Sequence, residues 1–140
     1  MTDRASLPFD MVNRPAHYNS HPSGVETVRL TEHLSAMIGS AVKYVWRRGL
    51  KGPIVQDLEK AAWCFRREAD RLREFDDASL WDGDYWRPLA KKVTAIDTTV
   101  LGDVLRVLLA VSPGVKDVGA CRQMAELCER EAEMLRTRGL

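Results

Sequence analysis

Residues 54–74 read IVQDLEKAAWCFRREADRLRE, and this stretch decides the fold. Its apolar residues recur at alternating intervals of three and four, which is typical of a helix packed nearly parallel to another helix. Gly52 and Pro53 precede the stretch and mark its start, since proline is tolerated in the first turn of a helix. The sequence therefore predicts a long amphipathic helix over 54–74, with a seam formed by Val55, Leu58, Ala62, Phe65, Ala69 and Leu72.

The same pattern returns 63 residues later. A gap-free shift of that size also places Gly39 on Gly102. One interpretation is an internal duplication, in which two related helical hairpins pack together because one hairpin cannot bury its own seam. The alternative is a coincidence of two amphipathic helices. In the shifted copy the six seam positions are Val118, Cys121, Ala125, Cys128, Ala132 and Leu135.

Capping residues and breaks predict four further helices. The first runs over 23–37, where Ser23 and Glu26 have the spacing of a capping box, and breaks at 39–40. The second covers 40–48 and ends at Gly49. The third follows Asp97 as its cap and runs to about residue 111, and the last covers 115–137. Residues 75–96 are acidic and aromatic and are predicted to form a connection, with Trp81, Tyr85 and Trp86 folding its first part onto the bundle.

The predicted fold class is therefore all-α, a compact bundle of about five helices in a single domain. Its parts are a flexible leader over 1–11, a helical half over 12–74, the connection over 75–96 and a C-terminal helical hairpin over 97–140. Of the two halves, only the first has a concentration of basic residues, because WRRGLKG at 46–52 corresponds to LAVSPGV at 109–115. The hairpin itself does not need these cations, so they indicate an added function.

Composition limits the classes of function. The 140 residues carry a formal net charge of +1, which argues against strong nucleic-acid binding. No apolar run approaches the roughly 20 residues of a membrane span, so we expect no membrane association. The three cysteines, Cys64, Cys121 and Cys128, lie at apolar helical positions. They are expected to be buried free thiols in a reducing cytoplasm.

The densest chemical signal lies in residues 39–52, which contain Lys43, Arg47, Arg48 and Lys51 and no acid. Lys43 and Arg47 are four residues apart and share one helical face. Lys51 stands between two glycines, where backbone amides can point at an anion. The pattern is typical of a phosphate clamp. The alternative is a solvated helix face whose cations complement the helix dipole.

The loop over 12–24 adds His17, Tyr18 and Asn19. A histidine and a tyrosine can stack on a base, and an asparagine can read a base edge. The alternative is a turn whose tyrosine fills the core. A magnesium site is a weaker option, because the paired Glu-x-x-Glu arrangement of helical pyrophosphohydrolases is absent. Its acids would be Asp57, Glu59 and Glu68 with Glu26 and Glu32.

Five short motifs, which follow one another between residues 12 and 63, resemble a family of small phage proteins. This family is labelled a domain of unknown function and includes the nucleotide kinase of short-tailed coliphages. The resemblance covers about residues 12–73. The chain has no Gly-x-x-x-x-Gly-Lys-Ser/Thr loop, and the resemblance implies a kinase that lacks one. The motifs are VNRPAHYN at 12–19, GVE at 24–26, GSAVKYVWR at 39–47, KG at 51–52 and DLEKAAW at 57–63.

The resemblance implies a site for deoxynucleotides. Lys43, Arg47 and Lys51 would hold phosphate, Tyr18 and Tyr44 would stack on the base, and Asn19 would read it. Asp57 and Lys60 would orient the acceptor or a metal-bound water, and no residue is assigned as catalytic base. The matching positions are His17, Tyr18, Asn19, Lys43, Tyr44, Arg47, Lys51, Asp57 and Lys60.

A kinase would need ATP or another nucleoside triphosphate as donor, with Mg²⁺ as an option. Two other functions stay open: a non-enzymatic protein that sequesters a nucleotide used in host-defence signalling, and a structural helical oligomer. We expect a homo-oligomer, located in the host cytoplasm if the chain is phage-encoded.

Overall fold

The computed structural model describes residues 18, 20–74, 85–111 and 117–139. This part of the chain contains helices and no strand, so the predicted all-α bundle is confirmed. The predicted leader over 1–11 and Trp81 lie outside it. The helices are α2 (Thr27–Thr31), α3 (Ala36–Arg47), α4 (Ile54–Glu74), α5 (Trp86–Thr94), α6 (Val100–Ala110) and α7 (Val118–Thr137).

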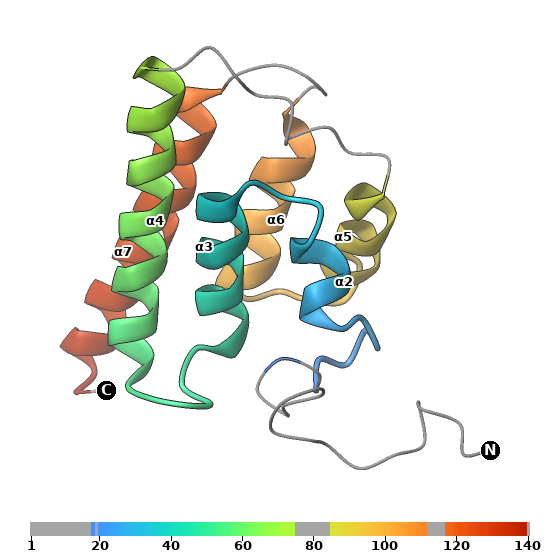
Figure 1. Ribbon diagram of the computed structural model, residues 1–140. Coiled ribbons are helices and arrows are strands. Elements are labelled where there is room, and N and C mark those ends of the chain that lie inside the picture. The colour runs from blue at the N-terminus through green and yellow to red at the C-terminus, as the bar shows by residue number, and fades with distance from the viewer. Residues whose placement is uncertain (1–17, 19, 75–84, 112–116, 140) are drawn as a thin grey trace.

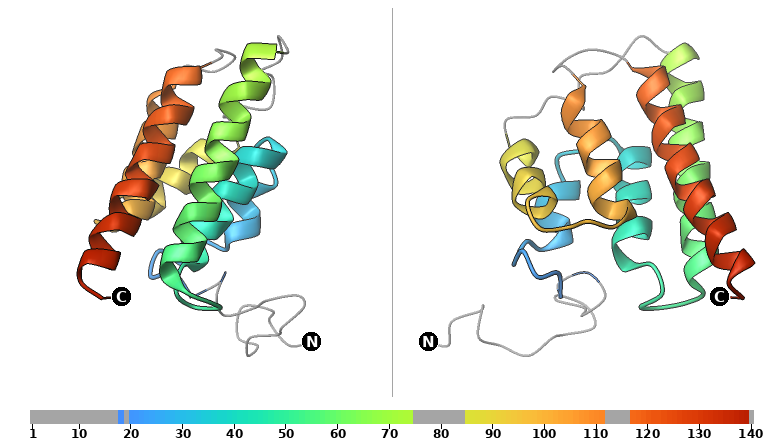
Figure 2. Two further views of the ribbon diagram at one scale, coloured as in Figure 1. Left: turned by 90° about the vertical axis from the view of Figure 1, so that its left-hand side faces the viewer. Right: turned by 180° about the vertical axis from the view of Figure 1, so that it is seen from behind.

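The two longest helices, α4 and α7, lie side by side and antiparallel (Figures 1 and 2). They make the most extensive helix–helix contact of the described residues. Alanines recur along both inner faces and allow close approach, while larger side chains fill the space between them. The predicted bounds 54–74 are those of α4. Residues buried along this interface include Leu58, Ala62, Phe65, Ala69, Met124, Ala125, Cys128 and Ala132.

The remaining helices repeat one arrangement in each half of the chain. Helix α3 packs on α4, and α6 packs on α7. A shift of 63 residues carries 36–47 to 99–110 and 54–74 to 117–137, within one residue of the bounds of α6 and α7. Arg66 and Glu129, which the shift also relates, form an ion pair with each other across α4 and α7. Contact between equivalent positions is what an approximate twofold axis produces, as two related hairpins require.

The prediction of one helix over 23–37 is wrong. The chain instead forms α2, turns at residues 32–35 and starts α3 at Ala36. The side chain of Ser35 caps α3 by accepting a hydrogen bond from the Ile38 amide. The expected break at Gly39 falls inside α3, where a Cβ would lie 3.2 Å from the Thr31 carbonyl oxygen. This glycine allows a close approach rather than ending a helix. Gly49, with φ +76°, does end the helix as predicted.

A helix that the sequence did not predict, α5, occupies 86–94 within the connection assigned to residues 75–96. Trp86, Ala90 and Val93 recur every three or four residues and are fully buried. Their burial stabilises the helix despite its short length. Tyr85, expected to fold onto the bundle, is 74% exposed.

All three cysteines are free and buried, as predicted. Burial raises the pKa of Cys121 and of Cys128 to about 12. Thr99, not Asp97, is the N-cap of α6. None of the described helices combines the length and the apolarity needed to cross a bilayer.

Gly102 provides a test of the packing at the start of α6. Adding a Cβ there would drive it into the Asp97 carbonyl group. We expect Gly102→Ala to lower the free energy of unfolding by about 1–3 kcal/mol, measured by urea denaturation. The matched control is Gly119, in the first turn of α7, where a Cβ meets only the Asp117 Oδ1 at 3.4 Å. Gly119→Ala should be neutral or raise stability by up to about 1 kcal/mol. Equal losses in both variants would contradict the close approach.

Candidate functional site

The candidate site lies where the end of α3 meets the start of α4. Gly49 ends α3, and the following turn returns the chain antiparallel to it (Figure 1). Lys43 and Arg47, four residues apart on α3, therefore face Asp57 and Lys60, three residues apart on α4. The turn between α3 and α4 thus brings candidate site residues of the two helices to one place.

The centre of this cluster is an ion pair between Arg47 and Asp57. Arg47 Nη2 donates to Asp57 Oδ1 at 3.2 Å, and Nη1 donates to the Tyr18 hydroxyl at 3.3 Å. The guanidinium also lies over the ring of Tyr44, 4.8 Å from its centroid. Burial alone would lower the pKa of Arg47, but Tyr18 and Asp57 raise it above its ordinary value. The guanidinium therefore stays charged.

Two atoms of this ion pair have no hydrogen-bond partner among the described residues, namely Arg47 Nε and Asp57 Oδ2. Both are buried. The Nε and Nη2 protons share one edge of a guanidinium, which is the edge that binds a carboxylate through both oxygens. The two groups are therefore oriented for side-on binding, but only the Nη2–Oδ1 hydrogen bond of the two possible bonds is formed.

Two exposed lysines lie above this buried pair. Lys43 Nζ is 5.5 Å from the centroid of the Tyr18 ring, and Lys60 Nζ is 5.7 Å from that of Tyr44. Each ammonium is attracted to the negative face of its ring. Three cations and one carboxylate leave two positive charges in excess, and the two lysines place this excess at the surface. The arrangement can attract and hold a small anion.

The structure brings together six of the nine predicted site residues: Tyr18, Lys43, Tyr44, Arg47, Asp57 and Lys60. Lys51 is exposed in the turn after α3, and its side chain makes no hydrogen bond or ion pair with the described residues. His17 and Asn19 lie outside those residues. Arg47, predicted to contact phosphate, is engaged by Tyr18 and Asp57, and 14% of its side chain is exposed.

The acids considered for a magnesium site are dispersed. Glu59 pairs with Arg136 at 2.6 Å, and Glu68 is buried against Ser35 and Arg71. Within the described ranges, no three histidine, cysteine, aspartate or glutamate residues are grouped as metal ligands would be.

Sequence reasoning missed the contacts that hold the loop next to Tyr18. His21 Nε2 lies 2.8 Å from Asp97 Oδ2, and its Nδ1 accepts a hydrogen bond from the Ser23 amide. The imidazole also packs against Trp46. Thr27 Oγ1 donates to the Tyr18 carbonyl at 2.6 Å. His21 and Asp97 are 76 residues apart, so no local pattern could have paired them.

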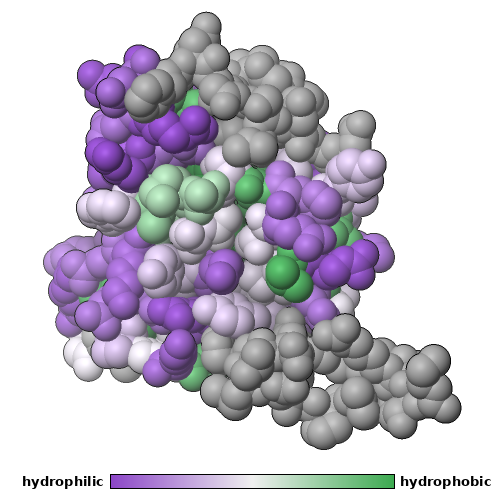
Figure 3. Space-filling view, in the orientation of Figure 1, coloured by the Kyte–Doolittle hydropathy of each residue, from purple (hydrophilic) through white to green (hydrophobic). Residues whose placement is uncertain are grey.

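On the surface, hydrophobic residues form small, separate patches among hydrophilic ones on the face drawn in Figure 3. One hollow lies in the groove between α4 and α7, and another lies between α6 and α7.

The fold is that of a helical-bundle protein, and the cluster is a candidate basic site beside the Arg47–Asp57 pair. Residues 12–65 match the model of a family described as a protein of unknown function (DUF3310). This match fits the resemblance to a phage domain of unknown function, and its range contains every predicted site residue. No curated protein and no solved structure matches the chain.

The ion pair predicts a clear pattern of stability changes. Arg47→Met leaves Asp57 buried without its partner and should cost about 3–5 kcal/mol of unfolding free energy. Adding Asp57→Leu should recover much of this loss, because no charge is then left buried. The control is Arg66→Met, which removes the exposed pair with Glu129 and should cost at most about 1 kcal/mol. Urea denaturation of the wild-type protein, both single variants of the pair, the double variant and the Arg66→Met control measures the pattern, and additive losses at 47 and 57 would contradict it.

Asp97 predicts an acid-sensitive contribution to stability. Burial alone would raise its pKa, but hydrogen bonds from Thr99, His21 and Gly102 lower it from 3.8 to about 2. Because the folded-state pKa is the lower one, the stabilisation is complete above 3.8 and is lost as the pH falls through about 2. Between pH 3.8 and about 2, the free energy of unfolding of Asp97→Asn should therefore change less with pH than that of the wild-type protein, as measured by urea denaturation at several pH values. Parallel curves for the two proteins would refute the assignment.

Proposed function

We propose that this chain is a phage nucleotide-handling protein that binds deoxynucleotides at the cluster around Arg47. The observation that carries the proposal is the pair of exposed lysines, Lys43 and Lys60, each held over a tyrosine ring above one buried ion pair. Positioned cations provide charge for a phosphate, and the neighbouring rings provide flat surfaces for a base. The resemblance over about residues 12–73 and the matched family range over 12–65 both contain the residues of this cluster.

The contacts divide the proposed roles. Lys43 and Lys60 contact phosphate, because they are exposed and, within the described part of the chain, their ammonium groups contact tyrosine rings and no carboxylate. Arg47 is a positioning residue, because it contacts Tyr18 and Tyr44, and the buried Asp57 holds Arg47 through their ion pair. This assignment moves the phosphate role from Arg47 to Lys60. Lys51 remains available for a second phosphate group from the turn.

The proposed activity is phosphorylation of a deoxynucleoside monophosphate without a P-loop. In phosphoryl transfer a protein mainly positions the two substrates and offsets the charge of the moving group. The cluster offers both, with ATP or another nucleoside triphosphate as donor and Mg²⁺ bound with it. The support for a kinase comes from the resemblance, while the geometry supports anion binding in general.

One observation favours a second candidate, a protein that binds and sequesters a nucleotide unchanged. The single carboxylate of the cluster, Asp57, is 3% exposed and paired with Arg47. It is therefore poorly placed to take a proton from an acceptor hydroxyl. Assembly into a homo-oligomer remains a prediction under either function.

The lysines provide the binding test. We expect Lys43→Ala with Lys60→Ala to weaken deoxynucleoside monophosphate binding by about tenfold or more, measured by isothermal titration calorimetry. The fold should be preserved, since both side chains are exposed. The matched control is Lys91→Ala with Lys92→Ala, two exposed lysines of α5 far from the site in sequence. Equal effects of the two double variants, or no binding of any nucleotide by the wild-type protein, would overturn the proposal.

Chromatography of the recovered ligand separates the two candidates. A nucleoside diphosphate formed from a monophosphate and ATP, and lost in the Lys43 and Lys60 double variant, would establish the kinase. Unaltered nucleotide released from a tight complex would establish sequestration.

A further inference from the structure

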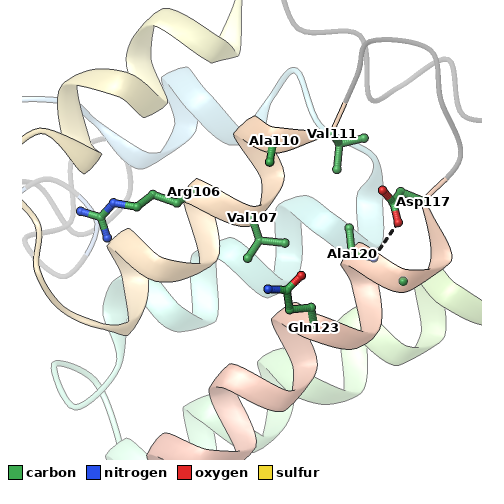
Figure 4. A pocket seen from close by; sticks show the side chains of 8 residues that line it. Arg106, Val107, Ala110, Val111, Asp117, Ala120 and Gln123 are labelled. Carbon is green, nitrogen blue, oxygen red and sulfur yellow. Dashed lines mark hydrogen bonds between the residues drawn. The ribbon is translucent and has the colours of Figure 1, made fainter.

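A hollow of about 540 Å³ lies between the end of α6 and the start of α7, on the half of the molecule that the proposed function does not use. Its size falls within the roughly 300–1,000 Å³ of small-molecule sites. Figure 4 shows Val107 of α6 and Gln123 of α7 facing each other across it. The lining residues are Arg106, Val107, Ala110, Val111, Asp117, Gly119, Ala120 and Gln123.

Every one of these eight positions has its counterpart at or beside the candidate site. Subtracting 63 from each number gives a set that includes the five cluster residues on α3 and α4. The hollow and the cluster are therefore the same place in the two halves of a repeated scaffold. In the order of the lining residues above, the counterparts are Lys43, Tyr44, Arg47, Arg48, Ile54, Gln56, Asp57 and Lys60.

The second half is hollow because its side chains are shorter. Arg47 and Asp57, which meet in the first half, correspond to Ala110 and Ala120. The Tyr44 ring, which lies over the guanidinium, corresponds to Val107. The same backbone arrangement thus encloses an ion pair in one half and open space in the other.

The hollow has a different charge from its counterpart. Arg106 extends away from it (Figure 4) and donates to the carbonyls of Thr94 and Asp97, at 2.9 and 2.8 Å, and to Asp103. Asp117 remains at the edge, where its Oδ1 accepts from the Ala120 amide at 2.7 Å. Among the described lining residues, Arg106 is engaged elsewhere and leaves Asp117 as the charged group at the hollow, and a carboxylate there disfavours phosphate. The walls are aliphatic, and the Gln123 amide offers one donor group and one acceptor.

We propose that this hollow is a second binding site, derived from the first by duplication, for an uncharged flat heteroaromatic ring with an amide-like edge. A nucleobase or a nucleoside without phosphate has this chemistry. The ring would contact Val107 and Ala110, and its edge would hydrogen-bond to Gln123. The site is independent of the lysines of the first half, so it does not rest on the nucleotide function proposed above.

The residues of the first half show which substitutions should fill the hollow. Ala110→Arg with Ala120→Asp places in the second half the two residues that the same scaffold already holds in the first. The experiment is an NMR titration of the full chain, labelled at methyl groups, with thymidine and deoxyguanosine as probes. We expect saturable shifts of the Val107, Ala110 and Ala120 methyl signals in the wild-type protein. In the filled variant, affinity should fall by about tenfold or more.

The control is Lys43→Ala with Lys60→Ala, which should leave nucleoside binding in the hollow unchanged. If that variant loses nucleotide binding but keeps the nucleoside shifts, the two sites are separate. No saturable shift with either nucleoside, or shifts that persist in the filled variant, would overturn the proposal. Urea denaturation tests whether the filled variant folds. The double variant Ala110→Arg with Ala120→Asp should lose less unfolding free energy than the sum of the losses in the two single variants. Additive losses would overturn the duplicated origin.

Discussion

The antiparallel packing of α4 against α7 is the constraint on which the rest of the structure depends. Alanines at 62, 69, 125 and 132 bring the two helices close, and Phe65, Met124 and Cys128 fill the interface. Neither helix could bury its apolar face within its own hairpin. Helices α3 and α6 then pack next to each other on one face of this pair (Figures 1 and 2), and α2 and α5 pack against each other. The two hairpins therefore stabilise each other.

The same packing positions the candidate site. Asp57 lies in the first turn of α4 beside Leu58, which is fully buried, so the helix carries its carboxylate into the protein. Burying a carboxylate is unfavourable unless it is paired, and Arg47 supplies the pairing from α3. The guanidinium in turn orders Tyr18 and Tyr44. The outer lysines are thus held over rings that the core itself fixes.

The sequence predicted what depends on local pattern and missed what depends on distant contacts. The seam of α4 and the left-handed stop at Gly49 are local, and both were predicted. The grouping of Lys43 with Arg47 follows from helical spacing, but their meeting with Asp57 was implied by the family resemblance. The break before α3 was missed, because Gly39 approaches the Thr31 carbonyl only once the helices pack. The burial of Arg47 and the contact between His21 and Asp97 likewise arise from tertiary structure.

The central claim is that a nucleotide binds over the buried Arg47–Asp57 pair, with its phosphate held by Lys43 and Lys60. The most direct measurement is a crystal structure of the full chain grown with a deoxynucleoside monophosphate. We predict phosphate oxygens within hydrogen-bond distance of both ammonium groups, a base against the Tyr18 or Tyr44 ring, and an intact ion pair beneath. A nucleotide bound elsewhere, or one that separates Arg47 from Asp57 to reach the guanidinium, would contradict it.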